Sequence, residues 1–259
     1  MIKSFRHRPA SLSRIIMIAA IAFALLAPLS TAGTAAKRKI LYVTHSAGFK
    51  HAVLPLSHDV LKEIGERSGL FEVTATDDLT SITIEGLKPY GAIVFYTTGE
   101  LPITDEQKAA LLNFIKSGKA FVGIHSATDT FYKWAEYGEM IGGYFDQHPW
   151  HQEVSVKVED QKHPATRHLG QSFKITDEIY QFKNWDRAKV HVLLSLDPGS
   201  VDLTKPAVHR TDKDFALAWC REYGRGRVFY IALGHRAEVW KDERFQQLLI
   251  GALRWATRS

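Results

Sequence analysis

The sequence predicts an α/β domain with a mainly parallel sheet and an antiparallel hairpin extension. Short apolar runs alternate with helical patterns in the first half of the chain, which is typical of a parallel sheet covered by helices on both faces. These runs cover residues 39–44, 71–76, 90–96 and 120–124. In the second half, runs 216–221 and 227–233 flank a Gly224-Arg225-Gly226 turn, which predicts a hairpin.

Residues 1–32 have the three parts of an export signal. A basic start is followed by the apolar run 15–29 and by Ser30-Thr31-Ala32, whose small side chains suit cleavage there or after Ala36. The apolar run is shorter than the roughly 20 residues that a membrane-spanning helix needs. We therefore expect export to the periplasm or the medium, with no stable membrane span after cleavage and a mature domain at residues 37–259.

Charge and cysteine content exclude some classes of protein. Residues 1–32 hold four of the 33 Lys and Arg and none of the 28 Asp and Glu, so 29 basic and 28 acidic residues remain, a net charge of +1. This balance gives no support to nucleic-acid binding. The single cysteine, Cys220, lies in an apolar run and is expected to be a buried hydrophobe.

The helices and the later strands are indicated by local signals. A helix at 54–68 should stop at Gly69, and a Thr104-x-x-Gln107 capping box should begin a helix at 104–116. Residues 131–150 are aromatic-rich and read as a loop or a broken helix, whereas 153–159 alternates Val with polar residues as a half-exposed strand does. A further strand is expected at 191–196, and Asp242 can cap a closing helix.

The run 120–124 continues into His125-Ser126-Ala127-Thr128-Asp129 and predicts a strand ending in a sharp elbow with His125 at its tip. His45 and His235 also directly follow apolar strands. Ligand crevices in such sheets lie beyond the carboxyl ends of the strands, so these three histidines are expected to converge. The alternative is three separate loop histidines, each satisfied by its own hydrogen bond.

Several motifs resemble the trehalose-utilisation (ThuA-like) family over residues 39–256. They are Thr44-His45-Ser46-x-Gly48-Phe49-x-His51, Gly123-Ile124-His125-Ser126-Ala127, Gly142-Gly143-x-Phe145-x-x-His148-Pro149, Asp177-Glu178-x-Tyr180, and Gly226-Arg227-Val228-Phe229-Tyr230 with Ala232-Leu233-Gly234-His235. The resemblance implies the class I glutamine amidotransferase-like fold, a flavodoxin-like three-layer sandwich. It also implies a role in carbohydrate metabolism.

The amidotransferases of this fold carry a catalytic Cys at the elbow, where this chain has His125. A thiolate attacks the glutamine amide, so glutaminase activity should be absent. The family's link to disaccharide use implies a small carbohydrate, a glycoside or a keto-sugar supplied by a partnering sugar oxidoreductase, and hydrolase- or lyase-like chemistry. A non-catalytic sugar- or metal-binding protein on the same scaffold is the alternative, and homo-oligomerisation stays open.

Two mechanisms suit the histidines. His45, His125 and His235 could hold a divalent metal such as zinc, with His51, Asp129 or Glu178 completing the shell. In the metal-free alternative, His125 and His235 exchange protons with the sugar while Glu178 or Asp129 orients one imidazole.

Aromatic and imidazole side chains are candidates for sugar binding. The predicted substrate contacts are His51, His148, Trp150, Tyr180 and Trp185. Trp150 could instead be a core residue in a rigid loop. Charged residues such as Lys157 and Arg221 are expected to be solvated surface.

Overall fold

The computed structural model describes residues 1, 2, 4 and 36–259. The expected signal peptide at 1–32 lies outside the described residues, apart from positions 1, 2 and 4, and Ala36–Ser259 forms one compact unit. No helix among the described residues combines the length and the apolar character needed to cross a membrane.

The unit is built on one nine-stranded sheet in the order β2-β1-β3-β4-β9-β8-β7-β5-β6. The strands are β1 Arg38–Val43, β2 Phe71–Thr76, β3 Ala92–Phe95, β4 Ala120–Ile124, β5 Tyr144–Val158, β6 Ser172–Lys183, β7 His191–Leu196, β8 Ala216–Tyr223 and β9 Gly226–Ile231. Strands β2, β1, β3, β4 and β9 pair in parallel, and the remaining pairs are antiparallel. The predicted parallel sheet with an antiparallel extension is confirmed.

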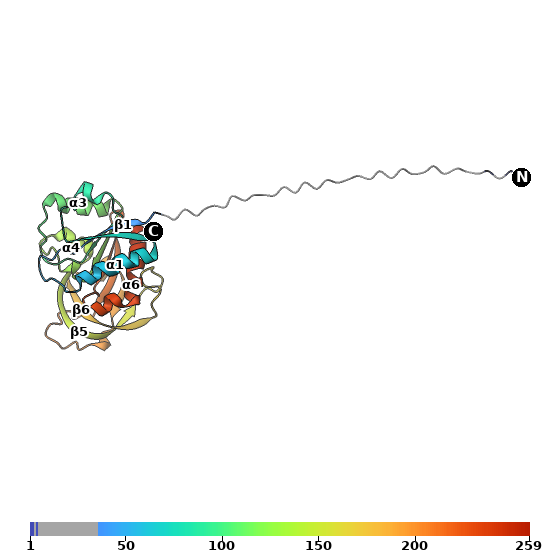
Figure 1. The fold of residues 1–259 in the computed structure, drawn as a ribbon. Coiled ribbons are helices and arrows are strands. Elements are labelled where there is room, and N and C mark those ends of the chain that lie inside the picture. The colour runs from blue at the N-terminus through green and yellow to red at the C-terminus, as the bar shows by residue number, and fades with distance from the viewer. Residues whose placement is uncertain (3, 5–35) are drawn as a thin grey trace. The chain divides into compact units, whose positions relative to one another are not determined.

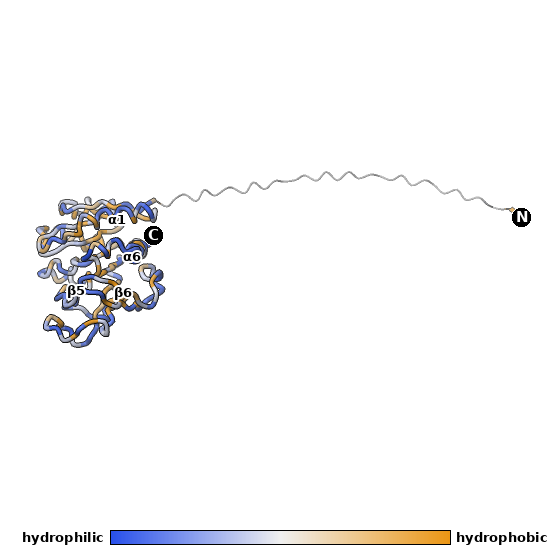
Figure 2. The backbone as a smooth tube through the Cα atoms, turned by 60° about the horizontal axis from the view of Figure 1, so that its bottom comes forward, coloured by the Kyte–Doolittle hydropathy of each residue, from blue (hydrophilic) through white to orange (hydrophobic). Residues whose placement is uncertain are grey.

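Six α-helices cover the sheet (Figure 1). They are α1 Leu54–Ser68, α2 Ile84–Leu87, α3 Asp105–Lys116, α4 Ala135–Ile141, α5 Ala237–Lys241 and α6 Glu243–Thr257. Helices α1, α5 and α6 pack against one another, and α2 packs against α3. Figure 2 shows hydrophilic stretches along the outer helix α1 and hydrophobic ones within the unit. Every residue of β3 and β4 is buried, as expected for central parallel strands covered on both faces.

The local signals that fix the helix ends have the predicted geometry. The Thr104 hydroxyl accepts from the Gln107 backbone N–H while the Gln107 side chain accepts from the Thr104 N–H, which completes the capping box. Gly69 ends α1 with φ 68°, a left-handed conformation that glycine adopts without a Cβ penalty. The Asp242 carboxylate caps α6 at Arg244 N. Cys220 is buried, as expected.

The structure corrects the prediction for residues 131–150 and adds a strand that the sequence did not reveal. That segment contains α4 and the first half of β5, a 15-residue strand of which the predicted run 153–159 is only the end. Strand β6 was not predicted, because Lys174, Asp177 and Glu178 interrupt its apolar pattern. Of these three residues, Asp177 and Glu178 belong to the site described next.

Candidate functional site

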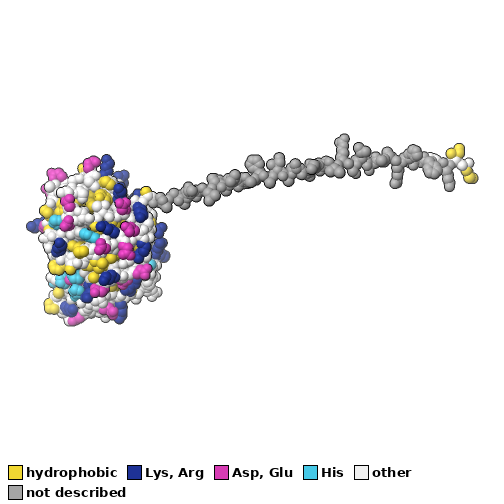
Figure 3. Space-filling view, in the orientation of Figure 1, with side chains coloured by type: hydrophobic (Ala, Val, Ile, Leu, Met, Phe, Trp, Pro, Cys, Tyr) yellow, Lys and Arg dark blue, Asp and Glu magenta, His cyan; other side chains and the backbone are white. Residues whose placement is uncertain are grey.

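Four side chains converge at the carboxyl ends of the parallel strands. His51 comes from the loop after β1, His125 from the 3-10 helix that follows β4, Glu178 from β6 and His235 from the loop after β9. One ligand atom from each lies within 4.8 Å of the others, and the first three residues are buried. Figure 3 shows histidine side chains gathered near the β5 and β6 end of the unit.

His125 stands on a strained elbow with its ring in a defined orientation. Its φ is 46°, which is unusual for a residue other than glycine and typical of functional sites. Its Nδ1 lies 2.7 Å from the carbonyl oxygen of Ala232, which can only accept, so Nδ1 carries the proton. The other ring nitrogen, Nε2, faces the cluster, 3.4 Å from Glu178 Oε2. Gly123 makes the tight packing possible, because a Cβ there would lie 3.0 Å from the Tyr230 ring.

Glu178 supplies the negative charge of the cluster. Its Oε2 lies 3.4 Å from His125 Nε2 and 3.3 Å from His235 Nδ1, and its Oε1 lies 3.7 Å from His148 Nδ1. Burial alone would raise the pKa of Glu178, but contact with His125 and His235 outweighs it and lowers that pKa, so the carboxylate stays ionised. The same contact raises the pKa of His235 against the opposing effect of burial.

Asp177, the neighbour of Glu178, fixes the loop that carries His235. Its buried carboxylate accepts hydrogen bonds from the backbone N–H groups of Gly234 at 2.6 Å and Arg236 at 3.0 Å. Gly234 has φ 126°, which a side chain would oppose. The sequence placed Asp177 in a motif but gave it no role. Its position beside Glu178 was the only signal available.

His51 completes the cluster, although it was predicted only as a substrate contact or an auxiliary ligand. Its ring centroid lies 5.0 Å from that of His125 and 5.2 Å from that of His235. Burial, followed by the proximity of His125 and His235, lowers the pKa of His51 to about 3, so the ring is neutral near pH 7. Its buried Nδ1 has no hydrogen-bond partner in the described part of the chain.

A cavity of about 280 Å³ opens onto the cluster. It is lined by Phe49, His51, Asp129, Phe145, His148, Glu178, Tyr180 and His235. Asp129 accepts a 2.6 Å hydrogen bond from the Tyr132 hydroxyl, and burial raises the Asp129 pKa. The Tyr180 hydroxyl lies 3.0 Å from His125 Nε2. The predicted residues Asp129, His148 and Tyr180 therefore share one cavity with the cluster.

His45 does not join the other histidines, which corrects the predicted ligand set. Its Nδ1 lies 2.9 Å from the Asp77 carbonyl oxygen, and its side chain lines a different cavity with Lys50 and His58. His45 lies at the start of the loop that follows β1. His51, six residues further along, takes the place expected of His45.

Trp150 and Trp185 also lie outside the cavity, contrary to their predicted role in substrate binding. Trp150 is fully buried, its Nε1–H donates to the Asp202 carbonyl oxygen at 2.9 Å, and its ring packs edge-on against Phe215. Trp185 is 8% exposed and packs against Trp219. Trp150 is thus a core residue, which was the alternative considered for it from the sequence. Trp185 is likewise part of the packing.

Comparison with known proteins places the chain in a family. The model of the family described as "ThuA: Trehalose utilisation" matches residues 39–256. The chain belongs to the ThuA family. No curated protein matches this ThuA protein at a significant level.

Solved structures agree with this assignment. A ThuA-like protein from Bacteroides uniformis is 27% identical, with a TM-score of 0.71 over 85% of this chain and 91% of that one. A ThuA-like protein from Parabacteroides merdae is 21% identical, with a TM-score of 0.67 over 85% and 90% of the two chains. PurLQS from Thermotoga maritima, at 18% identity and a TM-score of 0.52 over 84% and 99%, shows similarity at the level of the fold. The expected class I glutamine amidotransferase-like fold is confirmed.

Proposed function

We propose that the cluster of His51, His125, Glu178 and His235 binds a divalent metal ion such as zinc, and that the protein acts on a glycoside or keto-sugar in the adjoining cavity. The convergence of these four ligand atoms within 4.8 Å carries the proposal. Imidazole nitrogens combined with one carboxylate are a donor set that suits zinc. The buried, unpartnered Nδ1 atom of His51 also favours a ligand at this place.

The orientation of His125 supports the same proposal. Imidazoles that bind metals usually donate their other N–H to a carbonyl or a carboxylate, which fixes the tautomer and the ring plane. The contact of His125 Nδ1 with the Ala232 carbonyl oxygen is of this kind. Glu178 provides charge compensation because its carboxylate is ionised.

The cavity supports a small carbohydrate as the ligand. The family description refers to trehalose utilisation, and a volume of about 280 Å³ suits a small ligand or one end of a larger one. Phe49 and Phe145 offer aromatic faces for the apolar face of a sugar ring, while His148 and Tyr180 offer polar atoms to hydroxyl groups.

The chemistry we propose is hydrolase- or lyase-like. A bound divalent ion polarises coordinated oxygen atoms and lowers the pKa of coordinated water. Asp129 is the group we assign to proton transfer, because it lines the cavity and burial raises its pKa toward the working range of a general acid or base. Tyr132 orients Asp129 through its hydroxyl. Glutaminase activity is absent from this proposal because the elbow carries His125 in place of a cysteine.

Export belongs to the proposal as well, on the strength of the signal pattern at 1–32. The substrate would then be met outside the cytoplasm. A keto-sugar would be supplied there by a partnering sugar oxidoreductase.

The test is metal analysis of protein purified without a histidine tag, followed by turnover assays on glycosides and keto-disaccharides. We expect a stoichiometric divalent metal that is lost in His125→Ala and retained in His45→Ala, a matched histidine outside the cluster. Turnover should be lost in His125→Ala, which loses the metal, and kept in His45→Ala, which retains it. Metal without turnover favours the sugar- or metal-binding alternative, and turnover without metal favours acid–base catalysis by the histidines. The absence of both metal and turnover overturns the proposal.

A further inference from the structure

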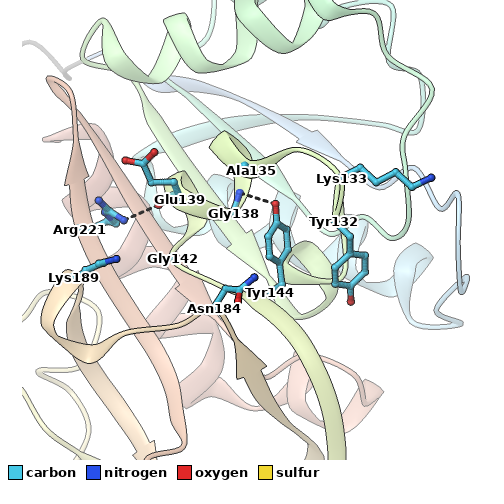
Figure 4. A pocket seen from close by; sticks show the side chains of 10 residues that line it. All are labelled: Tyr132, Lys133, Ala135, Gly138, Glu139, Gly142, Tyr144, Asn184, Lys189 and Arg221. Atoms are coloured by element: carbon cyan, nitrogen blue, oxygen red, sulfur yellow. Dashed lines mark hydrogen bonds between the residues drawn. The ribbon is translucent and has the colours of Figure 1, made fainter.

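A second cavity, of about 310 Å³, lies beside α4. Its charged and aromatic lining residues are Tyr132, Lys133, Glu139, Tyr144, Lys189 and Arg221. Figure 4 shows Arg221 and Lys189 on one side of the cavity and the two tyrosine rings on the other. None of these residues belongs to the four-residue cluster, so this cavity is open to a separate role.

Arg221 was expected to be a solvated surface residue, but its side chain is half-buried and held in place. Its Nη1–H donates to the carbonyl oxygen of Glu139 at 2.6 Å, near the C-terminal end of α4. Its buried Nε has no acceptor among the residues that the structure describes. A guanidinium anchored through one N–H keeps the others available and is pre-organised for a carboxylate or a phosphate.

The other cations around the cavity also lack acidic partners. The ion pairs found within residues 36–259 include neither Lys133 nor Lys189, although nearby Arg187 pairs with Glu159 and Asp214. Glu139 is the only carboxylate in the described lining. Figure 4 shows Lys133 extending away from the cavity, so Arg221 and Lys189 are the two cations on the cavity's side, against the single lining carboxylate of Glu139.

The walls of the cavity are fixed by close packing. A Cβ on Gly138 would lie 2.3 Å from the Tyr144 ring, and one on Gly142 would lie 2.8 Å from Trp219 Nε1. Tyr144 is held further because its hydroxyl accepts from the Gly138 N–H at 3.0 Å. The side of the cavity formed by Gly138, Gly142 and Tyr144 is thus rigidly packed.

We infer that this cavity is a second ligand site, which binds the oxyanion group of a small organic anion. Arg221 and Lys189 bind the carboxylate or phosphate oxygens, and the exposed part of Tyr132 packs against the rest of the molecule. Glu139 limits the affinity by repelling the anion. The site shares no residue with the four-residue cluster, and Tyr132, which also hydrogen-bonds Asp129, is the one link to the function proposed above. Lys189 lies outside that function, so a result on Lys189 bears on this inference alone.

The experiment is isothermal titration of the full chain with sodium phosphate and, separately, with sodium glucuronate, in a Tris chloride buffer at low ionic strength. Comparison of the two probes identifies the preferred oxyanion. We expect Lys189→Ala to weaken binding of the preferred probe about tenfold or more, as is usual when a charged hydrogen-bond partner is lost. Glu139→Gln should tighten it, and added salt should weaken it.

Lys62→Ala is the matched control, because Lys62 is an exposed lysine on α1. Arg221→Gln should also abolish binding, but this change removes the contact with α4, so Lys189→Ala is the decisive variant. Circular dichroism checks that each variant is folded. Absence of binding by both probes, or binding that is equally tight in Lys189→Ala and in the unaltered protein, overturns the inference.

Discussion

Replacing Asp177 with Asn or Ala tests how the loop that carries His235 is held in place. The carboxylate accepts two backbone hydrogen bonds, from Gly234 N at 2.6 Å and Arg236 N at 3.0 Å. Hydrogen bonds to a charged group contribute about 1.5–3 kcal/mol each. Asn keeps one acceptor oxygen and turns an amide N–H2 group toward the second backbone N–H, so we expect Asp177→Asn to cost ~2 kcal/mol and Asp177→Ala ~4 kcal/mol.

The same substitutions should weaken the proposed metal site, because His235 loses its support. Changes to groups that orient a metal ligand typically lower affinity by about 10- to 100-fold. The free energy of unfolding is measured by urea titration of the metal-free protein, and zinc affinity by competition with a chelator. Asp59→Asn, an exposed Asp on α1, is the control. If Asp177→Asn unfolds at the urea midpoint of the unaltered protein and binds zinc equally well, the reasoning about this loop is refuted.

Three further predictions follow from individual side chains. The buried His163 accepts a hydrogen bond from Ala165 N, and burial lowers its pKa from 6.5 to about 4. The unfolded chain therefore binds the extra proton first as the pH falls, so His163 alone should lower stability by ~2 kcal/mol between pH 7.5 and pH 5. His163→Gln should remove that contribution in urea titrations and leave the contribution of His51 in place. Equal pH dependence in the variant would contradict this. Tyr132→Phe removes a hydrogen bond that lowers the Asp129 pKa, so the acid limb of the pH–rate profile should move to higher pH; an unmoved limb would argue against Asp129 as the proton-transfer group. Trp150→Ala should cost about 3–5 kcal/mol of stability without changing the sugar affinity of the folded fraction, because the side chain is fully buried. A selective loss of sugar binding would show that Trp150 contacts the substrate after all.

The sequence revealed the elements whose signals are local. The capping box of Thr104 and Gln107 and the continuous apolar run of β4 need no information from elsewhere in the chain, and both were predicted correctly. Strand β6 was missed because Asp177 and Glu178 bring two carboxylates into its buried stretch, residues 177–182. A functional requirement had overridden the hydrophobic pattern there.

The sequence predicted that the site lies at the carboxyl ends of the strands, but it could not predict which histidine and tryptophan side chains enter it. His45 and His51 lie on the same loop, and only the folded path of that loop, bridged to Thr98 through Ser46, decides which ring turns inward. Trp150 follows a register shift in β5 after Gln147. A β-bulge changes the direction of the side chains beyond it, and residue alternation cannot locate one in advance.

Glu178 lies on the last strand in the order of the sheet, whereas His125 follows a strand of the parallel core. A ligand bound by both side chains therefore connects the edge strand β6 of the antiparallel portion with the parallel centre of the sheet. The antiparallel strands then cannot separate from the parallel part of the sheet unless the ligand dissociates. Binding of a ligand to the cluster should accordingly raise the melting temperature of the whole unit.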